Sequence, residues 1–562
     1  MKYLICCCLV LCVACTSVTP SFPPPVDYTD GGSVVREIET VRALIEEKPL
    51  EALLRAKRLQ LYAGSTETVS ALYRSSEAAV YRLFETAADE NRWEDALRLF
   101  RSLEALRSAP AGWSEEKITE AQRTVWKEKG YTALLQPDTS HNSSAADEAP
   151  SIQTVGRMMK GTVTVWVDRG ITIEKGMGRV DRMIGSGFFI DSQGYLITNY
   201  HVIQSDVDPE YEGYSRVYIK LPEDPAVRIP AKVVGWDPVF DLALLKTEIT
   251  PEVYFQLGSS RDLNAGSKIY AIGSPAGLEQ TVTSGIVSAQ NRRFLSLGSV
   301  LQIDAPVNHG SSGGPIIDER GLVQAIVFAG LERQESLNFA IPVELLKLIL
   351  PRLYAGGAVR HAWTAAYGRT AKGGENPGVE LIYALPGSSS AHIPAGTLIT
   401  HINGRQVGSL EALQNELMRL DSGTVIRISG RAPLPSAGTQ AAEKTPPVLP
   451  QQDWYLLLED RPEAPAEQIY RRDSASRAML PLYGLYLETA GRRKSFRIAD
   501  VIQGSYADEA GFSAGDYLEI RTMELRKDES AVYTQIYTKR RKAAYLDTFM
   551  DIWAYLDSPS YF

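Results

Sequence analysis

The first patterned region of the chain carries apolar residues at helical spacing. Between residues 36 and 136, apolar positions recur three and four residues apart, with polar or charged residues between them. Such spacing places the apolar side chains on one face of a helix. The pattern therefore predicts an α-helical domain over 36–136. Its two clearest stripes are Leu72, Ala79, Val80, Leu83, Phe84 and Ala87, and then Trp93, Ala96, Leu97, Phe100 and Leu103.

The periodicity changes after this region. Residues 137–154, which begin PDTSHNSSAADEAPS, have the composition of a linker. The run VTVWV and the short apolar runs GFFI, YLIT and KVVGW follow, separated by glycines and polar residues. Alternation with period two is typical of half-buried strands. We therefore predict an all-β barrel or sandwich over 155–354, closed by a helix at 343–354.

Two smaller patterned regions come next, at 358–461 and 476–556. Both mix short alternating runs with short helical ones, as small α+β domains do. A Pro- and Ala-rich insertion, RAPLPSAGTQAAEKTPPVLP at 431–450, interrupts the first of them.

A chain of 562 residues is too long for a single hydrophobic core, so a multidomain protein is expected.

The helical region contains one local resemblance. WEDALRLF at 93–100 is similar to one helix of a tetratricopeptide-type hairpin. No second clean copy occurs at a fixed period in the sequence. A tetratricopeptide-like domain and an ordinary helical bundle therefore both remain open.

All five cysteines lie within the first fifteen residues. Residues 3–14 form an apolar stretch that is too short to span a bilayer but long enough for a secretion signal. Small Ala14 precedes Cys15, and a Pro-, Ser- and Thr-rich tether fills 16–35. The pattern resembles a bacterial lipoprotein signal, 1–15, that ends at a lipidated Cys15; an ordinary secretory signal is the alternative. Lipidation predicts a membrane-anchored envelope protein, facing the periplasm or the outer surface, with no thiol left for disulfides, zinc or catalysis.

A candidate nucleophile, Ser312, lies in VNHGSSGGPII at 307–317. A serine attacks only when a base, an orienting acid and oxyanion donors surround it. Of the six histidines, His201 ends the apolar strand pattern YLITNYHVI, and Asp241 directly precedes the apolar run LALL. The order His201, Asp241, Ser312 is that of the chymotrypsin-type triad. The segment GSSGG at 310–314 also matches the G-x-S-x-G motif of α/β-hydrolases. That fold requires the histidine to follow the serine in the chain and a parallel sheet around the motif, so the sequence disfavours it.

Five collinear blocks then carry a resemblance to HtrA/DegP-type serine proteases. They are IGSGFFIDSQGYLITNYHVI, DPVFDLALLK, AIGSPAGLEQTVTSGIVSA, QIDAPVNHGSSGGPI and LNFAIP, and they span about 155–350. The resemblance implies a trypsin-like double barrel in which His201 is the general base, Asp241 orients it and Ser312 attacks. It also implies that the N–H groups of Gly310 and Ser312 form the oxyanion hole.

Further positions bear on activity and specificity. Ser311 stands where the family usually has Asn, and His309 where Pro or Arg is common, but neither has a triad role. Trypsin-like enzymes that cut after Lys or Arg carry Asp six residues before the nucleophile, where this chain has Pro306. Small or aliphatic residues are therefore expected before the scissile bond. The residues expected to line this pocket are Pro306, Asn338, Phe339 and Ala340.

The two downstream regions are similar to PDZ domains. GSYADEAG followed by GD in the second is a good match, whereas the first has Gly396-Thr397 where Gly-Asp is usual. PDZ grooves bind an extended peptide by strand addition and hold its terminal carboxylate with backbone N–H groups. A PDZ-shaped packing module with a closed groove stays open as the alternative. The carboxylate loop expected in the second copy is Tyr483, Gly484, Leu485 and Tyr486.

Composition narrows the function further. Apolar residues at 44% and charged residues at 23% are ordinary for folded domains, and a net charge of −9 argues against a nucleic-acid partner. No metal or cofactor is expected.

The predicted function is hydrolysis of misfolded or flexible polypeptides through an acyl-enzyme, with PDZ domains that recognise or gate the substrate. Relatives are commonly homotrimers. The alternatives are a non-catalytic PDZ scaffold or chaperone that retains the protease fold, and an interaction protein dominated by its helical domain.

Overall fold

The computed structural model describes most of the chain beyond residue 25. The predicted signal with Cys15, the loop residue His309 and most of the 431–450 insertion lie outside the described residues. No helix in the described part is long and apolar enough to cross a membrane. The described ranges are 26–136, 152–174, 177–274, 281–292, 298–308, 310–330, 338–371, 377–433, 450–491, 494–526, 530–542, 544–558 and 560–562.

The chain forms two compact units. The larger contains Val26–Ile382, His392–Glu463 and Asp557–Phe562, and the smaller contains Tyr383–Ala391 and Ala464–Leu556. The last six residues therefore belong to the larger unit, although they follow the smaller one in sequence.

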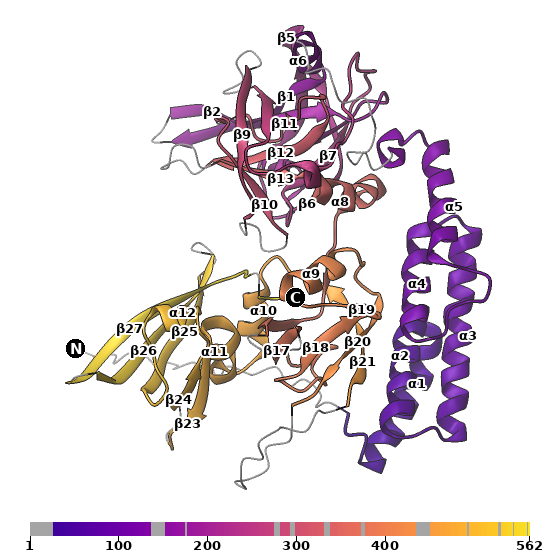
Figure 1. The fold of residues 1–562 in the computed structure, drawn as a ribbon, viewed down its shortest axis with the longest axis vertical. Coiled ribbons are helices and arrows are strands. Elements are labelled where there is room, and N and C mark those ends of the chain that lie inside the picture. The colour runs from indigo at the N-terminus through magenta and orange to yellow at the C-terminus, as the bar shows by residue number, and fades with distance from the viewer. Residues whose placement is uncertain are drawn as a thin grey trace, which may run out of the picture. The chain divides into compact units, whose positions relative to one another are not determined.

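The N-terminal region is a bundle of helices drawn in indigo and violet in Figure 1. Val80 and Phe84 of the predicted stripe are buried, whereas Leu83 is 42% exposed because it lies one position off the buried row. Thr66 and Ser114 cap helix N-termini by accepting backbone N–H bonds. The elements are α1 (Gly31–Glu47), α2 (Pro49–Tyr62), α3 (Glu67–Asp89), α4 (Trp93–Ala105), α5 (Glu115–Glu128) and η1 (Thr132–Leu135).

This helical domain packs against the first PDZ-like domain. The N–H of Val425 donates to the buried Ser102 Oγ at 2.9 Å, and Arg58 Nη2 donates to the Tyr455 carbonyl oxygen at 2.6 Å. Val425 and Tyr455 also complete an apolar core that is otherwise built from helical residues. A shared core and buried hydrogen bonds stabilise a fixed joint between the two domains.

The β-rich region after the linker contains two halves, and its fold class is confirmed. The first half is an eight-stranded sheet in the order β14-β6-β7-β3-β2-β1-β4-β5 rather than a closed barrel, and the second is a closed barrel in the order β10-β13-β12-β11-β8-β9. A core that includes Phe188, Ile272 and Leu346 joins the two halves. Leu346 belongs to helix α8, which is the closing helix predicted at 343–354.

The elements of the first half are α6 (Ile152–Met159), β1 (Thr162–Glu174), β2 (Met177–Phe189), β3 (Tyr195–Thr198), α7 (Tyr200–Val207), β4 (Arg216–Leu221), β5 (Asp224–Pro230), β6 (Lys232–Asp237), β7 (Leu242–Lys246) and the added strand β14 (Gly357–Ala358). Those of the second half are η2 (Ser260–Asp262), β8 (Lys268–Gly273), β9 (Thr281–Arg292), β10 (Val300–Ile303), β11 (Pro315–Ile317), β12 (Val323–Gly330), β13 (Asn338–Pro342) and α8 (Val343–Ala355).

Two PDZ-like sheets follow, as the sequence predicts. The first has the order β16-β17-β18-β20-β21, and the second β23-β24-β25-β26-β27. The first region contains β15 (Ala362–Trp363), β16 (Ala366–Thr370), β17 (Val379–Ala384), β18 (Leu398–Ile402), β19 (Arg405–Gln406), α9 (Leu410–Met418), β20 (Val425–Arg431), β21 (Gln452–Leu457) and β22 (Glu459–Asp460). The second contains α10 (Pro465–Arg472), α11 (Ala475–Tyr483), β23 (Leu485–Thr489), β24 (Ser495–Val501), α12 (Tyr506–Glu509), β25 (Tyr517–Arg526), β26 (Ala531–Lys542) and β27 (Ala544–Tyr555).

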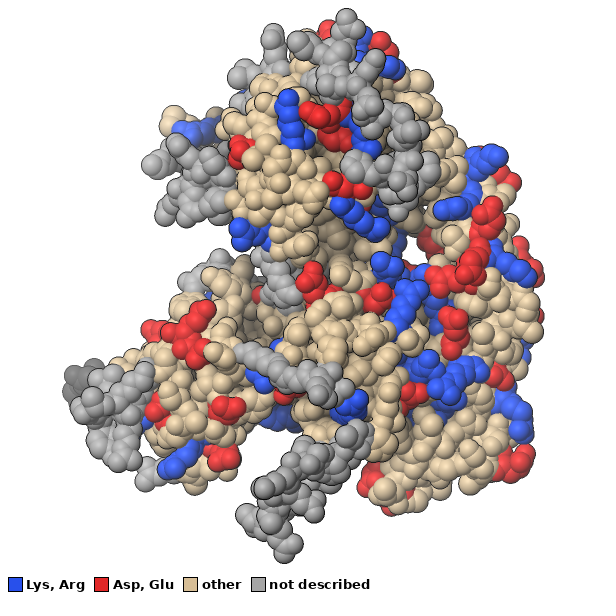
Figure 2. Space-filling model, viewed as in Figure 1, with Lys and Arg blue, Asp and Glu red and all other residues tan. Residues whose placement is uncertain are grey.

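The charged side chains show no single dominant sign on the face drawn in Figure 2. Lys and Arg are interspersed with Asp and Glu there. A nucleic-acid backbone would need a continuous basic surface, which this face does not offer.

Candidate active site

His201 and Asp241 form a doubly hydrogen-bonded pair. The imidazole Nδ1 lies 2.7 Å from Asp241 Oδ2, and the backbone N–H of His201 donates to Oδ1 of the same carboxylate at 2.7 Å. An ionised carboxylate only accepts hydrogen bonds, so Nδ1 carries the proton and the Nε2 lone pair is left as a base. The His201 side chain is 40% exposed and that of Asp241 only 10%, so the base can meet a substrate while its partner is shielded.

The local fold around His201 differs from the expectation. His201 was predicted at the end of a strand, but β3 ends at Thr198 and His201 lies in the first turn of helix α7. The first turn of a helix has backbone N–H groups without helical acceptors. Asp241 satisfies one of these groups, so the same carboxylate anchors the helix and orients the ring.

Asp241 is held by a tight turn between β6 and β7. Its φ of +54° is a left-handed conformation that Asp tolerates better than most residues. Asn199 Nδ2 donates to the Asp241 carbonyl oxygen at 2.8 Å. Asp237 Oδ1 accepts the N–H groups of Val239 and Phe240 at 2.8 and 3.1 Å, which closes the turn from its other side. The carboxylate position is therefore set by several independent bonds.

The Ser312 loop is fastened to β2, the neighbour in the sheet of strand β3, which leads into His201. Ser186 of β2 donates its N–H to the Ser312 carbonyl oxygen at 2.7 Å and its hydroxyl to the Gly310 carbonyl oxygen at 2.6 Å. Gly313 has φ +85°, and a Cβ there would lie 2.3 Å from the Ser186 carbonyl oxygen. Thr198 Oγ1 donates to that same carbonyl oxygen at 2.8 Å. The loop thus lies directly against the segment that leads into His201.

A buried network behind the loop was missed by the sequence reasoning. The N–H of Ser274 donates to Ser186 Oγ at 2.9 Å, and Ser274 Oγ bonds Thr164 Oγ1 at 2.7 Å. All three residues are buried. Ser186 lies inside the block IGSGFF, but its role depends on partners 88 and 124 residues away. Local periodicity carries no signal for such pairs.

The hydroxyl of Ser312 does not bond the imidazole in this arrangement. Within the described residues its hydrogen bond is a long one, 3.4 Å, to the carbonyl oxygen of Phe328. The N–H groups of Gly310 and Ser312 have no acceptor among the described residues, and Gly310 adopts φ +97°. Free amides beside a nucleophile are the donors that a developing oxyanion requires. The His201–Asp241 pair is therefore formed, while the Ser312 hydroxyl bonds the Phe328 carbonyl oxygen and not the imidazole.

The predicted pocket residues lie on two adjacent segments of the second barrel. Asn338 Nδ2 donates to the Ala305 carbonyl oxygen at 2.9 Å, which ties β13 to the residue beside Pro306. Phe339 and Ala340 are buried in the same strand, and Pro306 is exposed. Enzymes that cut after Lys or Arg carry Asp six residues before the attacking serine. The corresponding position here is the apolar Pro306.

The predicted carboxylate loop of the second PDZ-like domain is only partly available. The Tyr483 hydroxyl bonds the Val532 carbonyl oxygen and Thr534 within the core, and burial raises the pKa of Tyr483. The Gly484 N–H donates to the Leu480 carbonyl oxygen at 2.8 Å because this glycine ends helix α11. Packing uses the Tyr483 hydroxyl and helix capping uses the Gly484 N–H, and the role of these two residues in a carboxylate loop stays a prediction. Leu485 is buried at the start of β23 and Tyr486 follows it, and their role stays a prediction.

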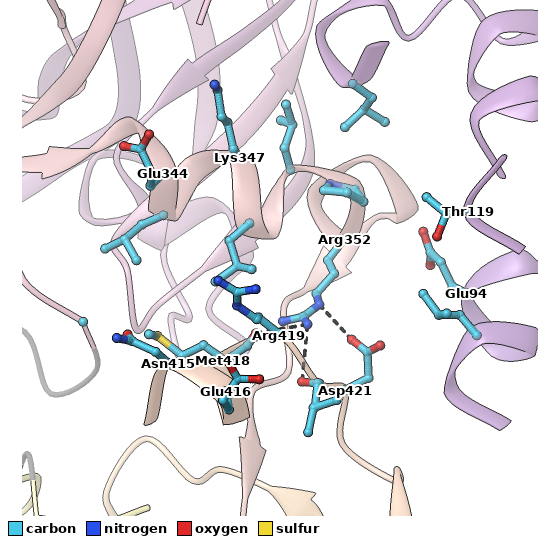
Figure 3. A pocket seen from close by; sticks show the side chains of 18 of the residues that line it. Glu94, Thr119, Glu344, Lys347, Arg352, Asn415, Glu416, Met418, Arg419 and Asp421 are labelled. Carbon is cyan, nitrogen blue, oxygen red and sulfur yellow. Dashed lines mark hydrogen bonds and ion pairs between the residues drawn. The ribbon is translucent and has the colours of Figure 1, made fainter. Parts of the chain in front are cut away.

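A cleft of about 1380 Å³ lies apart from the predicted triad residues, none of which lines it. It lies among α4, α8 and α9, and Figure 3 shows Arg352 of α8 extending toward Asp421. Arg352 Nε bonds Asp421 Oδ1 at 2.8 Å, and Glu94 lines the cleft from α4. Burial and the nearby Asp421 raise the pKa of the Glu94 carboxyl. Residues of the helical domain, the protease domain and the first PDZ-like domain line this cleft, so it is a junction between these three domains.

The two β halves, with the His201–Asp241 pair beside the Ser312 loop, have the arrangement of a trypsin-like peptidase domain, and PDZ-like domains follow them. Residues 185–326 match the trypsin-like peptidase domain, 466–556 the TP0546 family PDZ domain, and 33–125 a domain of unknown function. The resemblance to HtrA/DegP-type proteases is thereby confirmed for the protease and the second PDZ region.

Three individual proteins illustrate the relationship. The protein named "Probable periplasmic serine endoprotease DegP-like" of Bartonella henselae is 33% identical, and the alignment covers 43% of this chain and 50% of that protein. The protein of the same name from Brucella suis biovar 1 is 30% identical, with 64% and 70% covered. The solved structure of the HtrA-type protease AlgW with decapeptide is 23% identical, with 55% and 98% covered and a TM-score of 0.44.

The chain belongs to the DegP-like family of HtrA-type serine proteases. It nevertheless spans only half the length of the Bartonella relative. Its activity is therefore argued below from its own residues.

Proposed function

We propose that this protein is a serine endopeptidase of the cell envelope that hydrolyses misfolded or flexible polypeptides through an acyl-enzyme. The observation that carries the proposal is the doubly bonded His201–Asp241 pair next to the anchored Ser312 loop. A positioned base with a fixed tautomer is what a serine hydroxyl needs to become a nucleophile.

The proposed mechanism uses four groups. Ser312 Oγ leaves its long bond to Phe328 and transfers its proton to His201 Nε2 while attacking the scissile carbonyl carbon. Asp241 stabilises the resulting imidazolium and keeps its orientation. The N–H groups of Gly310 and Ser312 receive the oxyanion, and each such donor typically lowers the barrier by about 3 kcal/mol. His201 then protonates the leaving amine, and water hydrolyses the acyl-enzyme by the same route.

We extend the proposal to specificity. The exposed Pro306 and the buried Phe339 and Ala340 supply no carboxylate for a cationic side chain. Small or aliphatic residues should therefore precede the cleaved bond. A set of peptides that differ only at that residue tests this, with Ala or Val expected to be cut at least tenfold faster than Lys.

Location and assembly are part of the proposal. The relatives' names place those proteins in the periplasm, and the lipoprotein-type signal ending at Cys15 supports a membrane anchor in the envelope. The proposed assembly is a homotrimer, and an interaction surface for it is supported by apolar side chains on the β1–β2 hairpin, where Ile171 and Ile173 are 70% and 78% exposed. Exposed apolar groups of this kind mark interaction sites. Light scattering measures the molar mass of wild type and of the double variant Ile171→Ser/Ile173→Ser. Wild type should have the mass of a trimer, and the double variant that of a monomer.

Cleavage of an unfolded protein such as reduced casein tests the central activity. Wild type should produce fragments and Ser312→Ala should produce none above background. Ser288→Ala, an exposed serine on the second barrel, is the matched control and should cleave like wild type. Intact casein with folded wild type would favour the scaffold or chaperone alternative.

A further inference from the structure

Three cations surround the ring of Trp166 in the first half of the protease domain. Lys220 Nζ lies 4.3 Å from a ring centroid of the indole, and the guanidinium carbons of Arg182 and Arg228 each lie 4.8 Å from one. The indole is only 8% exposed, whereas both arginines are exposed. The neighbouring strands β2, β1, β4 and β5 each supply one of these four residues, which we call the Trp166 cluster.

The Trp166 cluster carries more positive charge than its neighbours neutralise. Arg228 pairs with Asp168 at 3.4 Å. Arg182 and Lys220, by contrast, form no ion pair with any described residue. Burial lowers the pKa of Lys220, and so do the like charges of Arg228 and Arg182. Cations held this close repel one another, and an indole attracts each of them only weakly. A bound anion would relieve that repulsion, so the cluster is suited to carboxylate groups.

The Trp166 cluster lies on the same face of the sheet as the side chain that anchors the Ser312 loop. Ser186 Oγ of β2 bonds the Gly310 carbonyl oxygen, and Ser186 pairs with Thr164 of β1. Thr164 and Trp166 are alternate residues of β1, so their side chains point to the same face. The two positions lie about 7 Å apart along the strand. The cluster therefore begins one row of side chains away from the anchor of the Ser312 loop.

Its place in the first half determines which part of a substrate meets the cluster. The pocket predicted for the residue before the cleaved bond, with Phe339 and Ala340, belongs to the second barrel. His201, which protonates the leaving amine in the proposed mechanism, belongs to the first half. The segment that follows the cleaved bond therefore departs across the first half. At about 3.3 Å per extended residue, its second to fifth residues reach the Trp166 cluster.

We propose that the Trp166 cluster binds acidic side chains in the substrate segment that follows the cleaved bond. Carboxylates there accept charge-assisted hydrogen bonds from Arg182 and Lys220, which are stronger than those between neutral groups. The inference rests on the proposed function, because it names a substrate feature for the same reaction. It adds a second determinant of specificity, on the opposite side of the bond from the apolar pocket.

Fluorescence anisotropy with the Ser312→Ala protein measures this binding without cleavage. The probes are a labelled peptide with three consecutive glutamates between Gly and Ser residues, and the same peptide with three glutamines. The glutamate peptide should bind at least tenfold more tightly at about 50 mM NaCl, and this difference should shrink at about 500 mM because salt screens exposed charges. Equal affinities of the two peptides at low salt would overturn the proposal.

Single substitutions locate the binding. Lys220→Gln and Arg182→Gln each remove one cation that has no ion pair and leave Trp166 in place. Each should weaken the glutamate peptide about threefold or more and leave the glutamine peptide unchanged. Lys268→Gln is the matched control, because Lys268 is an exposed cation over the ring of Tyr270 in the second barrel. An equal loss in Lys268→Gln and Lys220→Gln would contradict the cluster as the binding site.

Steady-state cleavage places the acidic segment relative to the bond. Two substrates share an Ala before the cleaved bond and carry three glutamates either after the bond or before that Ala. With the glutamates after the bond, KM should be at least fivefold lower than for the glutamine match at similar kcat, because remote binding acts on KM. Equal gains for both orders would contradict the proposal. If wild type cleaves neither substrate, the proposed protease function fails, while the anisotropy measurements still decide whether the cluster binds carboxylates.

Discussion

His361 Nε2 lies 2.8 Å from Asp237 Oδ2, and both side chains are almost completely buried. The ring of His361 also packs edge-on against Phe240 at 4.7 Å. His361 belongs to the segment that leads into the first PDZ-like domain, while Asp237 and Phe240 form the turn that ends at Asp241. The pair therefore fastens the turn that ends at Asp241 to the interdomain segment.

His361 is predicted to be a positioning residue for the triad. In His361→Leu, a buried carboxyl oxygen of Asp237 loses its donor, which costs about 1–3 kcal/mol of folding free energy. The displaced turn should lower kcat between roughly tenfold and a hundredfold with little change in KM, because misplaced catalytic groups cost rate. Steady-state kinetics on a peptide substrate measures this split. His361→Gln, which can still donate from Nε2, should recover most of kcat; equal losses in both variants would contradict the positioning role.

Asp241→Asn should separate orientation from folding. The Asn oxygen can still accept the His201 N–H, and Asn tolerates the left-handed φ. Its NH₂ group faces Nδ1, so the ring must carry its proton on Nε2, where it no longer acts as a base. We expect kcat to fall on the order of 10⁴-fold with an unchanged thermal midpoint. Asp241→Ala should lose stability as well, because Ala is strained at φ +54°; a near-wild-type kcat in Asp241→Asn would contradict the assignment.

Ser186→Ala tests the network beneath the oxyanion loop. The substitution removes the donor to Gly310 and the acceptor for the Ser274 N–H, both buried. We expect a stability loss of about 1–3 kcal/mol and a fall in kcat between roughly tenfold and a hundredfold. Urea unfolding and kinetics on one preparation check both effects. Ser288→Ala, an exposed serine, should alter neither; full activity of Ser186→Ala would show that the loop does not depend on this bond.

The buried carboxyl of Asp191 should make the folding stability depend on pH. Burial raises the pKa of its carboxyl, although hydrogen bonds from the Tyr195 N–H, the Tyr354 hydroxyl and the Gln193 N–H act in the opposite direction. The folded state thus binds this proton more tightly than the unfolded state. The stabilising contribution is fully present below the unfolded pKa, near 3.9, and is lost as pH rises through the folded pKa.

Asp191→Asn removes that titration while keeping an oxygen acceptor. Measured in the Ser312→Ala background by urea unfolding, the variant should gain stability relative to wild-type Asp191 as pH rises from 4 to 7. The exposed Asp89→Asn is the matched control and should show no such trend. A difference that is flat or reversed for Asp191→Asn would contradict the effect of burial on this carboxyl.

The sequence singles out His201, Asp241 and Ser312 as candidates because each lies in a block with its own local pattern. Asp241 precedes a buried strand and Ser312 lies in a glycine-rich turn, and both placements agree with the structure. His201 was misassigned to a strand because the apolar run YLIT continues without a break into NYHVI. Helix α7 forms there since Asp241 supplies an acceptor at its N-terminus, which is a tertiary effect.

Longer-range features had no sequence signal. Arg182, Lys220 and Arg228 reach the ring of Trp166 from three other strands, and no local pattern in the sequence joins them. The Ser186 network likewise joins distant segments. Pairing between such segments leaves no periodicity along the chain, so the structure was required to find both.

Covalent labelling of Ser312 tests the account most directly. A fluorophosphonate reacts only with a serine whose proton a neighbouring base removes and whose oxyanion is stabilised. Folded wild type should give one adduct, mapped to Ser312 by mass spectrometry, and Ser312→Ala should give none. Absence of an adduct on wild-type protein with native circular dichroism would contradict the triad as a working catalytic device.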